Sequence, residues 1–349
     1  MTRIDLRPHN DALTRRTVIV WVGLVVVAIV LAIHGVTNAG GAAAHDVLEN
    51  WVSDAAVWTV AIMCTVAAAR ARHNRAAWLL VAAGLVFWAI GDTLWSLRGD
   101  PDAVTSISDV FWLAWYPLIV AALVLLVRDR VPGFELHRWI DGVVVMLVVA
   151  TPWVALFLQP AAEHSSANTL ADAVDFAYPL GDAVVVGATL GVLALMGWRA
   201  GPMWTALCVG FATLALADAI YSVDVLGHSY NAETSFDAVW LAGAMLVAYA
   251  AWLPHPGKLE PVRVTGWRAV ALPLAAQAFA IIVQLISIFV EVPPSASILT
   301  IVVLLIAMVQ IVITRPRAAD DASAVEVPGA VAEPAVVEQL EPDPRVVGE

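Results

Sequence analysis

Three aspartates lie well inside stretches of the sequence that are otherwise apolar: Asp92, Asp182 and Asp218. A charged side chain at the centre of a lipid bilayer costs about 3 kcal/mol, so such residues usually face the interior of a helix bundle or a water-filled cavity. There a carboxylate can bind a cation or a cationic solute, or it can accept hydrogen bonds that tie neighbouring helices together. These acids are therefore candidates for either chemistry.

Tyrosine and proline accompany the acids at helical spacing. Asp175, Tyr178 and Asp182 are separated so that all three lie on one face of a helix. Pro179 lies within this stretch and Pro117 within another, and a proline inside a helix leaves a backbone carbonyl without its usual partner. At membrane depth, such carbonyls are tolerated where they are buried in protein or line water. The pattern predicts a polar site between helices.

The predicted site combines carboxylates with aromatic side chains, several of which carry hydrogen-bond donors. Its residues are Asp92, Trp95, Asp109, Trp112, Trp115, Tyr116, Asp175, Tyr178, Asp182, Asp218, Tyr221, Asp237 and Trp240. One interpretation is structural, with Trp and Tyr donors holding buried carboxylates as ties between helices. The other is a cavity for a cationic or small-molecule ligand from outside the cell. Helix capping is the favoured interpretation for four acids that open apolar stretches: Asp54, Asp109, Asp172 and Asp237.

The acids recur in an internal repeat. The spacing from Trp78 to Asp92 equals the spacing from Trp204 to Asp218, and each Asp is followed three residues later by an aromatic side chain. Further along, DVFWLA at 109–114 matches DAVWLA at 237–242. The sequence therefore predicts a helical-hairpin repeat within residues 76–253, with both copies in the same orientation.

The composition is that of a membrane protein, with 61% hydrophobic and 14% charged residues, against about 25% charged in soluble domains. Apolar stretches near 20 residues are long enough to cross a bilayer. Ten are predicted: 18–36, 51–69, 76–96, 108–127, 139–158, 173–197, 203–225, 235–253, 269–290 and 296–313. We therefore expect an all-α, polytopic bundle over residues 18–315, in which 269–313 form an extra pair outside the repeat.

The distribution of Lys and Arg predicts the orientation, because cytoplasmic loops are enriched in these residues. With both termini in the cytoplasm, Arg98 is the one Lys or Arg residue left outside. The outer face is then strongly acidic, which disfavours nucleic acid as a partner and concentrates cations. Residues 1–17 form a basic cytoplasmic leader. The acidic, Pro-containing stretch 316–349 is predicted to be a disordered cytoplasmic tail.

The motifs of several large enzyme classes are absent from the sequence. It has no P-loop, GxSxG, HExxH or Rossmann glycine cluster, and we expect neither an enzyme nor a cofactor. The four histidines that could reach the outer side are scattered singly and lack metal-ligand spacing, so no metal site is predicted. They are His34, His45, His164 and His228. Cys64 and Cys208 fit packing positions better than a disulfide.

Residues 75–315 resemble a known membrane family in SISDVFWLAWYP, AYPLGD and ALADAIYSVD followed by FDAVW. The segment is similar to the multi-pass input module that precedes GGDEF and EAL domains in actinobacterial cyclic-di-GMP signalling proteins. The resemblance implies a membrane bundle with a sensory role. No GGDEF-like or EAL-like segment follows Arg317, so cyclase or phosphodiesterase activity is not implied.

Two functions are consistent with these patterns. The first is a sensor or scaffold in the bacterial plasma membrane that passes the state of an outward-facing site to a cytoplasmic signalling partner, or that acts as a homodimer. The second is a secondary transporter of a cation or cationic solute, since transporters often contain repeats and interrupted helices. The common orientation of the copies and the outward position of the acids favour the sensor. A remnant of a longer GGDEF/EAL protein is a third interpretation.

Overall fold

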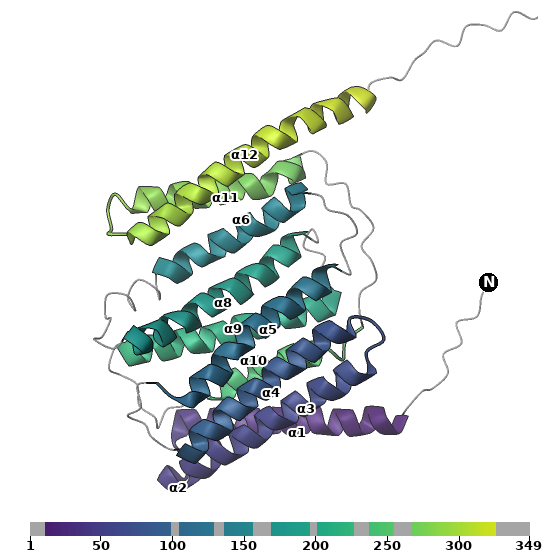
Figure 1. Cartoon of the computed structure of the whole chain (residues 1–349), viewed down its shortest axis with the longest axis vertical. Helices are drawn as coiled ribbons and strands as arrows, with labels where there is room; N and C mark the ends of the chain where they lie inside the picture. The colour runs from purple at the N-terminus through teal and green to yellow at the C-terminus, as the bar shows by residue number, and fades with distance from the viewer. Residues whose placement is uncertain are drawn as a thin grey trace, which may run out of the picture.

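A computed structural model of the chain describes residues 11–98, 105–128, 136–155, 169–195, 201–226, 237–254 and 267–325, and every regular element in these ranges is a helix (Figure 1). The elements are α1 (Asp11–Thr37), α2 (Gly41–His45), a π-helical segment η1 (Asp46–Val52), α3 (Ser53–Arg70), α4 (Arg75–Arg98), α5 (Ile107–Arg128), α6 (Leu136–Trp153), α8 (Thr169–Leu195), α9 (Gly201–Leu226), α10 (Asp237–Ala250), α11 (Trp267–Ile286) and α12 (Pro294–Val325). The expected all-α fold class is confirmed for these ranges.

Six of the described helical stretches are long and apolar enough to cross a membrane. They are Arg15–Thr37, Ala43–Arg70, Arg75–Arg98, Ile107–Arg128, Phe176–Leu193 and Gly201–Tyr221. Four further apolar helices are shorter: Gly142–Trp153, Asp237–Ala250, Leu274–Ile286 and Pro294–Gln310. The helices are thus compatible with an integral membrane protein, and the full set of ten crossings stays a prediction.

The helices stack side by side along the long axis of the molecule (Figure 1). Helix α4 packs on α3 and α5, and α9 packs on α8 and α10. The two groups join through α5 against α8 and through α10 against α3. At one edge of the stack α1 packs on α10, and at the other edge α11 and α12 pack on α6. The start of α1 and the end of α12 lie on the same side of the stack (Figure 1), which is the relation expected for two termini in one compartment.

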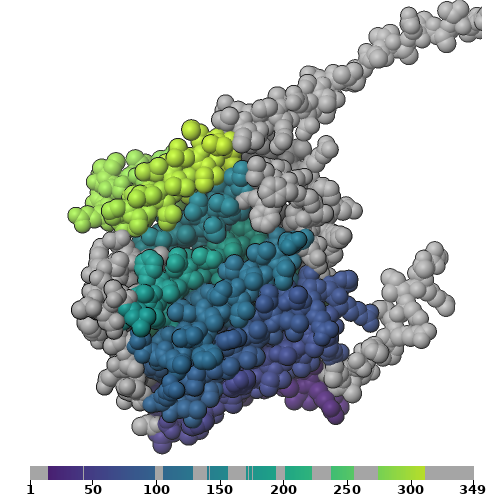
Figure 2. All heavy atoms as spheres, viewed as in Figure 1, coloured from purple at the N-terminus to yellow at the C-terminus, as the bar shows by residue number. Residues whose placement is uncertain are grey.

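One large apolar core holds most of the described helices together. It runs from α1 to α10, with Trp204, Leu85 and Ile119 fully buried, and the described helices lie in continuous contact across the visible face (Figure 2). A smaller core joins α6, α11 and α12. Gln284 of α11 donates a hydrogen bond to the Thr300 hydroxyl of α12 at 2.5 Å, which adds a polar contact between these two helices.

The outer surface of the stack is also apolar. On α1, Val22 is 56% exposed and Ile29 is 51% exposed, and this helix buries only a narrow stripe against its neighbours. Exposed aliphatic side chains along a whole helix are unfavourable in water but not in hydrocarbon. The surface chemistry therefore agrees with the length and hydropathy of the helices.

Two sequence-based expectations about helix ends are wrong. The chain is helical without interruption from Gly41 to Arg70, and the residue before α3 makes no side-chain capping bond. Asp54 lies inside this continuous stretch, 7% exposed, so it does not cap a helix N-terminus. Helix α12 continues past the predicted end of the bundle at 315 to Val325, so the tail is helical up to that residue. Residues 326–349 lie outside the described ranges.

Candidate functional site

The start of α5 is fixed by a reciprocal capping arrangement. The backbone N–H of Ser108 donates to the Ser106 hydroxyl at 3.1 Å, and the backbone N–H of Ser106 donates to Asp109 Oδ2 at 2.7 Å. This is a capping box, which satisfies donors that the first turn leaves free. Capping is thus confirmed for Asp109. Its second oxygen, Oδ1, accepts a hydrogen bond from the Tyr178 hydroxyl at 2.7 Å, so the same carboxylate also ties α5 to α8.

The two acids at repeat-related positions make the same contact. Trp112 Nε1–H donates to Asp92 Oδ1 at 2.8 Å, which joins α5 to α4. Trp240 Nε1–H donates to Asp218 Oδ1 at 2.7 Å, which joins α10 to α9. In each hairpin the aromatic residue three positions after the Asp packs on that Trp, with ring centroids 6.0 Å apart for Trp95 and 6.1 Å for Tyr221.

Asp218 also has a contact with a residue from outside its own hairpin. The Tyr116 hydroxyl lies 3.0 Å from Asp182 Oδ1 and 3.5 Å from Asp218 Oδ2. A phenol has one proton to donate, so one carboxyl receives it and the other does not. Asp182 is only 5% exposed, and its Oδ2 has no hydrogen-bond partner. Three helices, α5, α8 and α9, therefore meet at one hydroxyl and two carboxyls.

These contacts form a connected set that we call the acid–aromatic cluster. It consists of Asp109, Tyr116, Tyr178, Asp182, Asp218 and Trp240. The rings of Tyr116 and Tyr178 meet edge to face at 6.4 Å, which links the Asp109 end to the Asp182 end. Most of the predicted site residues thus lie in this cluster or in the tie between Asp92 and Trp112.

Two predicted site residues, Trp115 and Asp237, lie elsewhere. Trp115 is 5% exposed in the apolar core, where it packs against Trp88 at 5.4 Å between ring centroids. The position of Trp115 is explained by its burial in the apolar core and not by a contact with an acid. The carboxyl group of Asp237, at the start of α10, lies near that of Glu49. The side chain of Asp175 is outside the described residues, as is that of Asp172.

Two glycines whose role was not predicted make the ties sterically possible. A Cβ on Gly91 would lie 2.6 Å from Trp112 Nε1, and a Cβ on Gly181 would lie 2.5 Å from the ring of Tyr116. Real Cβ atoms do not approach other atoms that closely. Each glycine directly precedes an acid of the site. The Gly-Asp pairs at 91–92 and 181–182 are therefore the sequence feature from which these close contacts could have been predicted.

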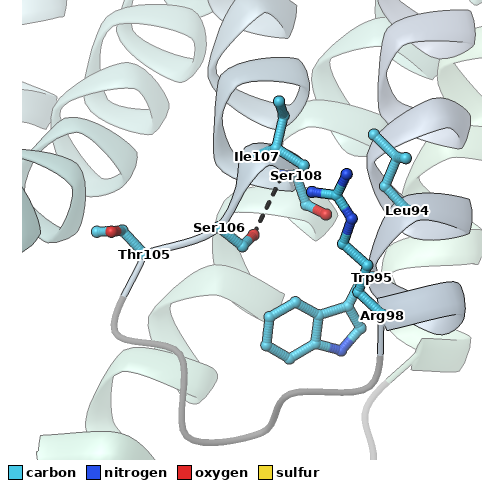
Figure 3. A pocket seen from close by; sticks show the side chains of 7 residues that line it. All are labelled: Leu94, Trp95, Arg98, Thr105, Ser106, Ile107 and Ser108. Atoms are coloured by element: carbon cyan, nitrogen blue, oxygen red, sulfur yellow. Dashed lines mark hydrogen bonds between the residues drawn. The ribbon is translucent and has the colours of Figure 1, made fainter.

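A cavity of about 240 Å³ lies between the end of α4 and the start of α5. Its lining residues are Leu94, Trp95, Arg98, Thr105, Ser106, Ile107 and Ser108. Figure 3 shows the Arg98 side chain reaching toward the serines that open α5, with the Trp95 ring across from Thr105. Of the predicted site residues only Trp95 lines it, so this cavity is separate from the acid–aromatic cluster.

The prediction that the outer histidines lie singly is wrong for two of them. The rings of His34 and His45 are 5.8 Å apart, and the Glu49 carboxylate lies beside them, 3.9 Å from His34 Nε2. The chain turns back between α1 and α2, which brings residues distant along the sequence together. The side chains of His164 and His228 are outside the described residues.

The chain was compared with protein-family models, curated proteins and solved structures, and none of them matches it. The site is therefore interpreted from its own geometry. The resemblance of residues 75–315 to a signalling input module stays a prediction.

The tie between Asp92 and Trp112 leads to a first expected result. Asp92→Asn keeps an oxygen that can accept the Trp112 indole N–H, so it should lower the free energy of unfolding by less than Trp112→Phe does. Trp112→Phe removes the donor and should cost about 0.6 kcal/mol, the mean for hydrogen bonds between membrane helices, and at most about 1.7 kcal/mol. Unfolding titrations in mixed SDS and detergent micelles measure both. A larger loss in Asp92→Asn than in Trp112→Phe contradicts a purely structural tie.

Proposed function

We propose that the chain is a multi-pass protein of the bacterial plasma membrane that binds a cation or a cationic solute at the acid–aromatic cluster. The observation that carries this proposal is the pair Asp182 and Asp218 around the single hydroxyl of Tyr116. The carboxyl groups of the pair lie within interaction distance of each other. Two carboxylates in a medium of low dielectric constant repel strongly, and a cation between them removes that repulsion.

The surroundings suit a positively charged ligand. Asp182 keeps one buried oxygen without a hydrogen-bond partner, and Asp218 is less buried than Asp182. The faces of aromatic rings attract cations. Tyr116, Tyr178 and Trp240 place such rings around the two acids.

The position of the pair supports a sensory role. Asp182 lies on α8, Asp218 on α9 and Tyr116 on α5, so a ligand between the acids contacts helices from both predicted repeat units. A ligand that binds one arrangement of these helices more tightly shifts the equilibrium toward that arrangement. The resemblance to a signalling input module adds to this argument. The expected readout is a soluble signalling partner on the cytoplasmic side.

A secondary transporter is the second candidate, favoured by the prolines inside α5 and α8. Pro117 directly follows Tyr116, and Pro179 directly follows Tyr178, so in both helices a proline without a backbone N–H lies beside a residue of the cluster. Helix-breaking residues near a coupling site are typical of transporters. The predicted common orientation of the two hairpins and the outward position of the acids still favour the sensor.

Ligand binding can be followed by the fluorescence of the 15 tryptophans of the chain, among which Trp240 is bonded through its N–H to Asp218. Purified protein in nanodiscs is titrated with sodium, potassium and tetramethylammonium chloride while tryptophan fluorescence is recorded. We expect a saturable change in the natural chain that is lost in Asp182→Asn and Asp218→Asn. Asp92→Asn is the matched control because it alters the other indole-bonded acid. Absence of a response to all three cations in the natural chain contradicts the proposal.

Flux measurements separate the two candidate functions. In proteoliposomes with a proton or sodium gradient, the sensor predicts no coupled uptake of the cations that change the fluorescence. Coupled uptake that disappears in Asp182→Asn and Asp218→Asn identifies a transporter instead. Cross-linking in native membranes then tests the partner, and a recurring soluble signalling protein supports the sensor.

A further inference from the structure

A second group of side chains converges at the end of the bundle where α1 turns back into α2. It consists of His34 near the end of α1, His45 at the end of α2 and Glu49 in η1. One ligand-type atom from each residue, an imidazole nitrogen or a carboxylate oxygen, lies within 4.8 Å of the others. Two imidazoles and a carboxylate are a donor set that zinc sites use.

The converging atoms are buried and lack hydrogen-bond partners. His34 is 2% exposed and Glu49 is 8% exposed. His34 Nε2, His45 Nδ1 and both oxygens of Glu49 have no hydrogen-bond partner. Buried polar atoms are normally bonded, and a group of them facing one point calls for an explanation such as an ion. A hydrogen bond between His34 and Glu49 is not that explanation, because His34 Nε2 and Glu49 Oε1 are 3.9 Å apart.

The second nitrogen of His34 is held in the manner of a metal-ligating histidine. Its Nδ1 lies 3.0 Å from the backbone carbonyl of Ala39, and an N–H at Nδ1 can donate to that oxygen. This tautomer leaves a lone pair on Nε2, the atom that faces Glu49. Histidine ligands of metals commonly donate their other ring N–H to a carbonyl or carboxylate, which fixes the ring and raises its basicity as a ligand.

The local helix geometry brings the other two side chains to the same point. His45 and Glu49 are four residues apart, a spacing that places two side chains on one helix face. Between Asp46 and Val52 the helix widens into a π-helical turn, and such turns inside helices occur frequently at functional sites. Sequence spacing alone did not indicate the site because His34 reaches it from a different helix.

We propose that His34 Nε2, His45 Nδ1 and the Glu49 carboxylate bind a divalent transition-metal ion, for which Zn²⁺ is the best fit. Imidazole nitrogen suits zinc, whereas magnesium and calcium prefer ligand sets made of oxygen alone. Ligand atoms of a tetrahedral zinc ion lie about 3.4 Å apart, so the three side chains close inward on binding. Asp237, whose carboxyl group lies near that of Glu49, is the candidate for a fourth ligand.

This site is separate from the acid–aromatic cluster and does not depend on the proposed function. Its ligands come from α1, α2 and η1, and Asp237 belongs to α10. A bound ion therefore fastens the turn between α1 and α2 and adds positive charge where Glu49, Asp237, Asp92 and Asp54 act on one another electrostatically. No Lys or Arg belongs to this group of described residues.

The test is zinc binding by the full-length chain, purified without a polyhistidine tag and stripped with EDTA. After dialysis against micromolar Zn²⁺, we expect about one zinc ion per chain by mass spectrometry of the metal, and a zinc-dependent rise in Tm. Isothermal titration should show at least about 100-fold weaker binding in His34→Gln and Glu49→Gln, since even residues that only support ligands change affinity by 10–100-fold. Cobalt substitution adds a visible spectrum that reports the ligand set.

His73→Gln is the matched control, because His73 is exposed in the turn between α3 and α4. It should bind zinc as the natural chain does. Size-exclusion profiles and the Tm without metal show whether each variant is folded. A stripped natural chain that takes up no zinc overturns the proposal, as does zinc binding of unchanged affinity in folded His34→Gln and Glu49→Gln. In that case the contact between His34 and Glu49 is structural and does not serve metal binding.

Discussion

Gly181→Leu should destabilise the protein and pull the acid–aromatic cluster apart. A Cβ at this position would lie 2.5 Å from the ring of Tyr116, and the rest of a leucine side chain adds further overlap. Overpacking of this kind typically costs about 1–3 kcal/mol. Because Tyr116 is the residue that must move, its hydroxyl loses its place between Asp182 and Asp218. We expect a lower free energy of unfolding in mixed micelles, together with loss of the fluorescence response to cations.

Gly23→Leu is the matched control for this substitution. Gly23 lies on α1, and nothing lies within 4 Å of a Cβ built on it. The same change of side chain there should leave both stability and the cation response as in the natural chain, or stabilise α1 slightly through better helix propensity. Equal losses of stability and of cation response in the two variants would mean that the close contact between Gly181 and Tyr116 does not cause the effect of Gly181→Leu. A stable Gly181→Leu protein with an intact response contradicts the cluster geometry.

Tyr116→Phe should remove the cation response while leaving the protein folded. The substitution keeps the ring, which packs near Gly181 and Tyr178, and deletes only the hydroxyl between the two carboxyls. Its structural cost should be close to the mean for hydrogen bonds between membrane helices, about 0.6 kcal/mol. The larger effect falls on ligand binding, because the carboxyls then lose the donor that sets their spacing.

Tyr178→Phe provides the comparison. It deletes a hydroxyl bonded to Asp109 at 2.7 Å, but Asp109 keeps its bond from the backbone of Ser106. We expect a similar small loss of stability and an unchanged cation midpoint in the fluorescence titration. If Tyr178→Phe abolishes the response and Tyr116→Phe does not, the ligand lies at the Asp109 end. That result would move the proposed site away from the Asp182 and Asp218 pair.

Much of the local architecture could be predicted from the sequence. Apolar stretches of membrane-spanning length identified the helices, because length and hydropathy are properties of one continuous segment. Ser106 and Asp109 identified the start of α5, since a capping box is built from neighbouring residues. One of the two interpretations of the recurring acids, that Trp and Tyr donors hold them as ties between helices, agrees with the contacts in both hairpins. Asp92 pairs with Trp112 and Asp218 with Trp240, each within one hairpin.

Contacts between separate segments could not be predicted in this way. The Tyr116 hydroxyl reaches Asp182 and Asp218 only because α5 packs on α8 and α8 on α9. Capping by Asp54 failed because a π-helical turn continues the helix ahead of it, and no local pattern signals such a turn.

The sequence by itself determined that this chain is helical, strongly apolar and interrupted by acids at regular positions. Only the tertiary structure decided which acids share a donor, which tryptophan belongs to the core and which histidines meet. His34 and His45 are each unremarkable in their own segment, and the turn between α1 and α2 brings their rings to 5.8 Å beside Glu49. The physical reason is that helix periodicity fixes the direction of side chains within one helix, whereas packing between helices fixes which side chains they meet.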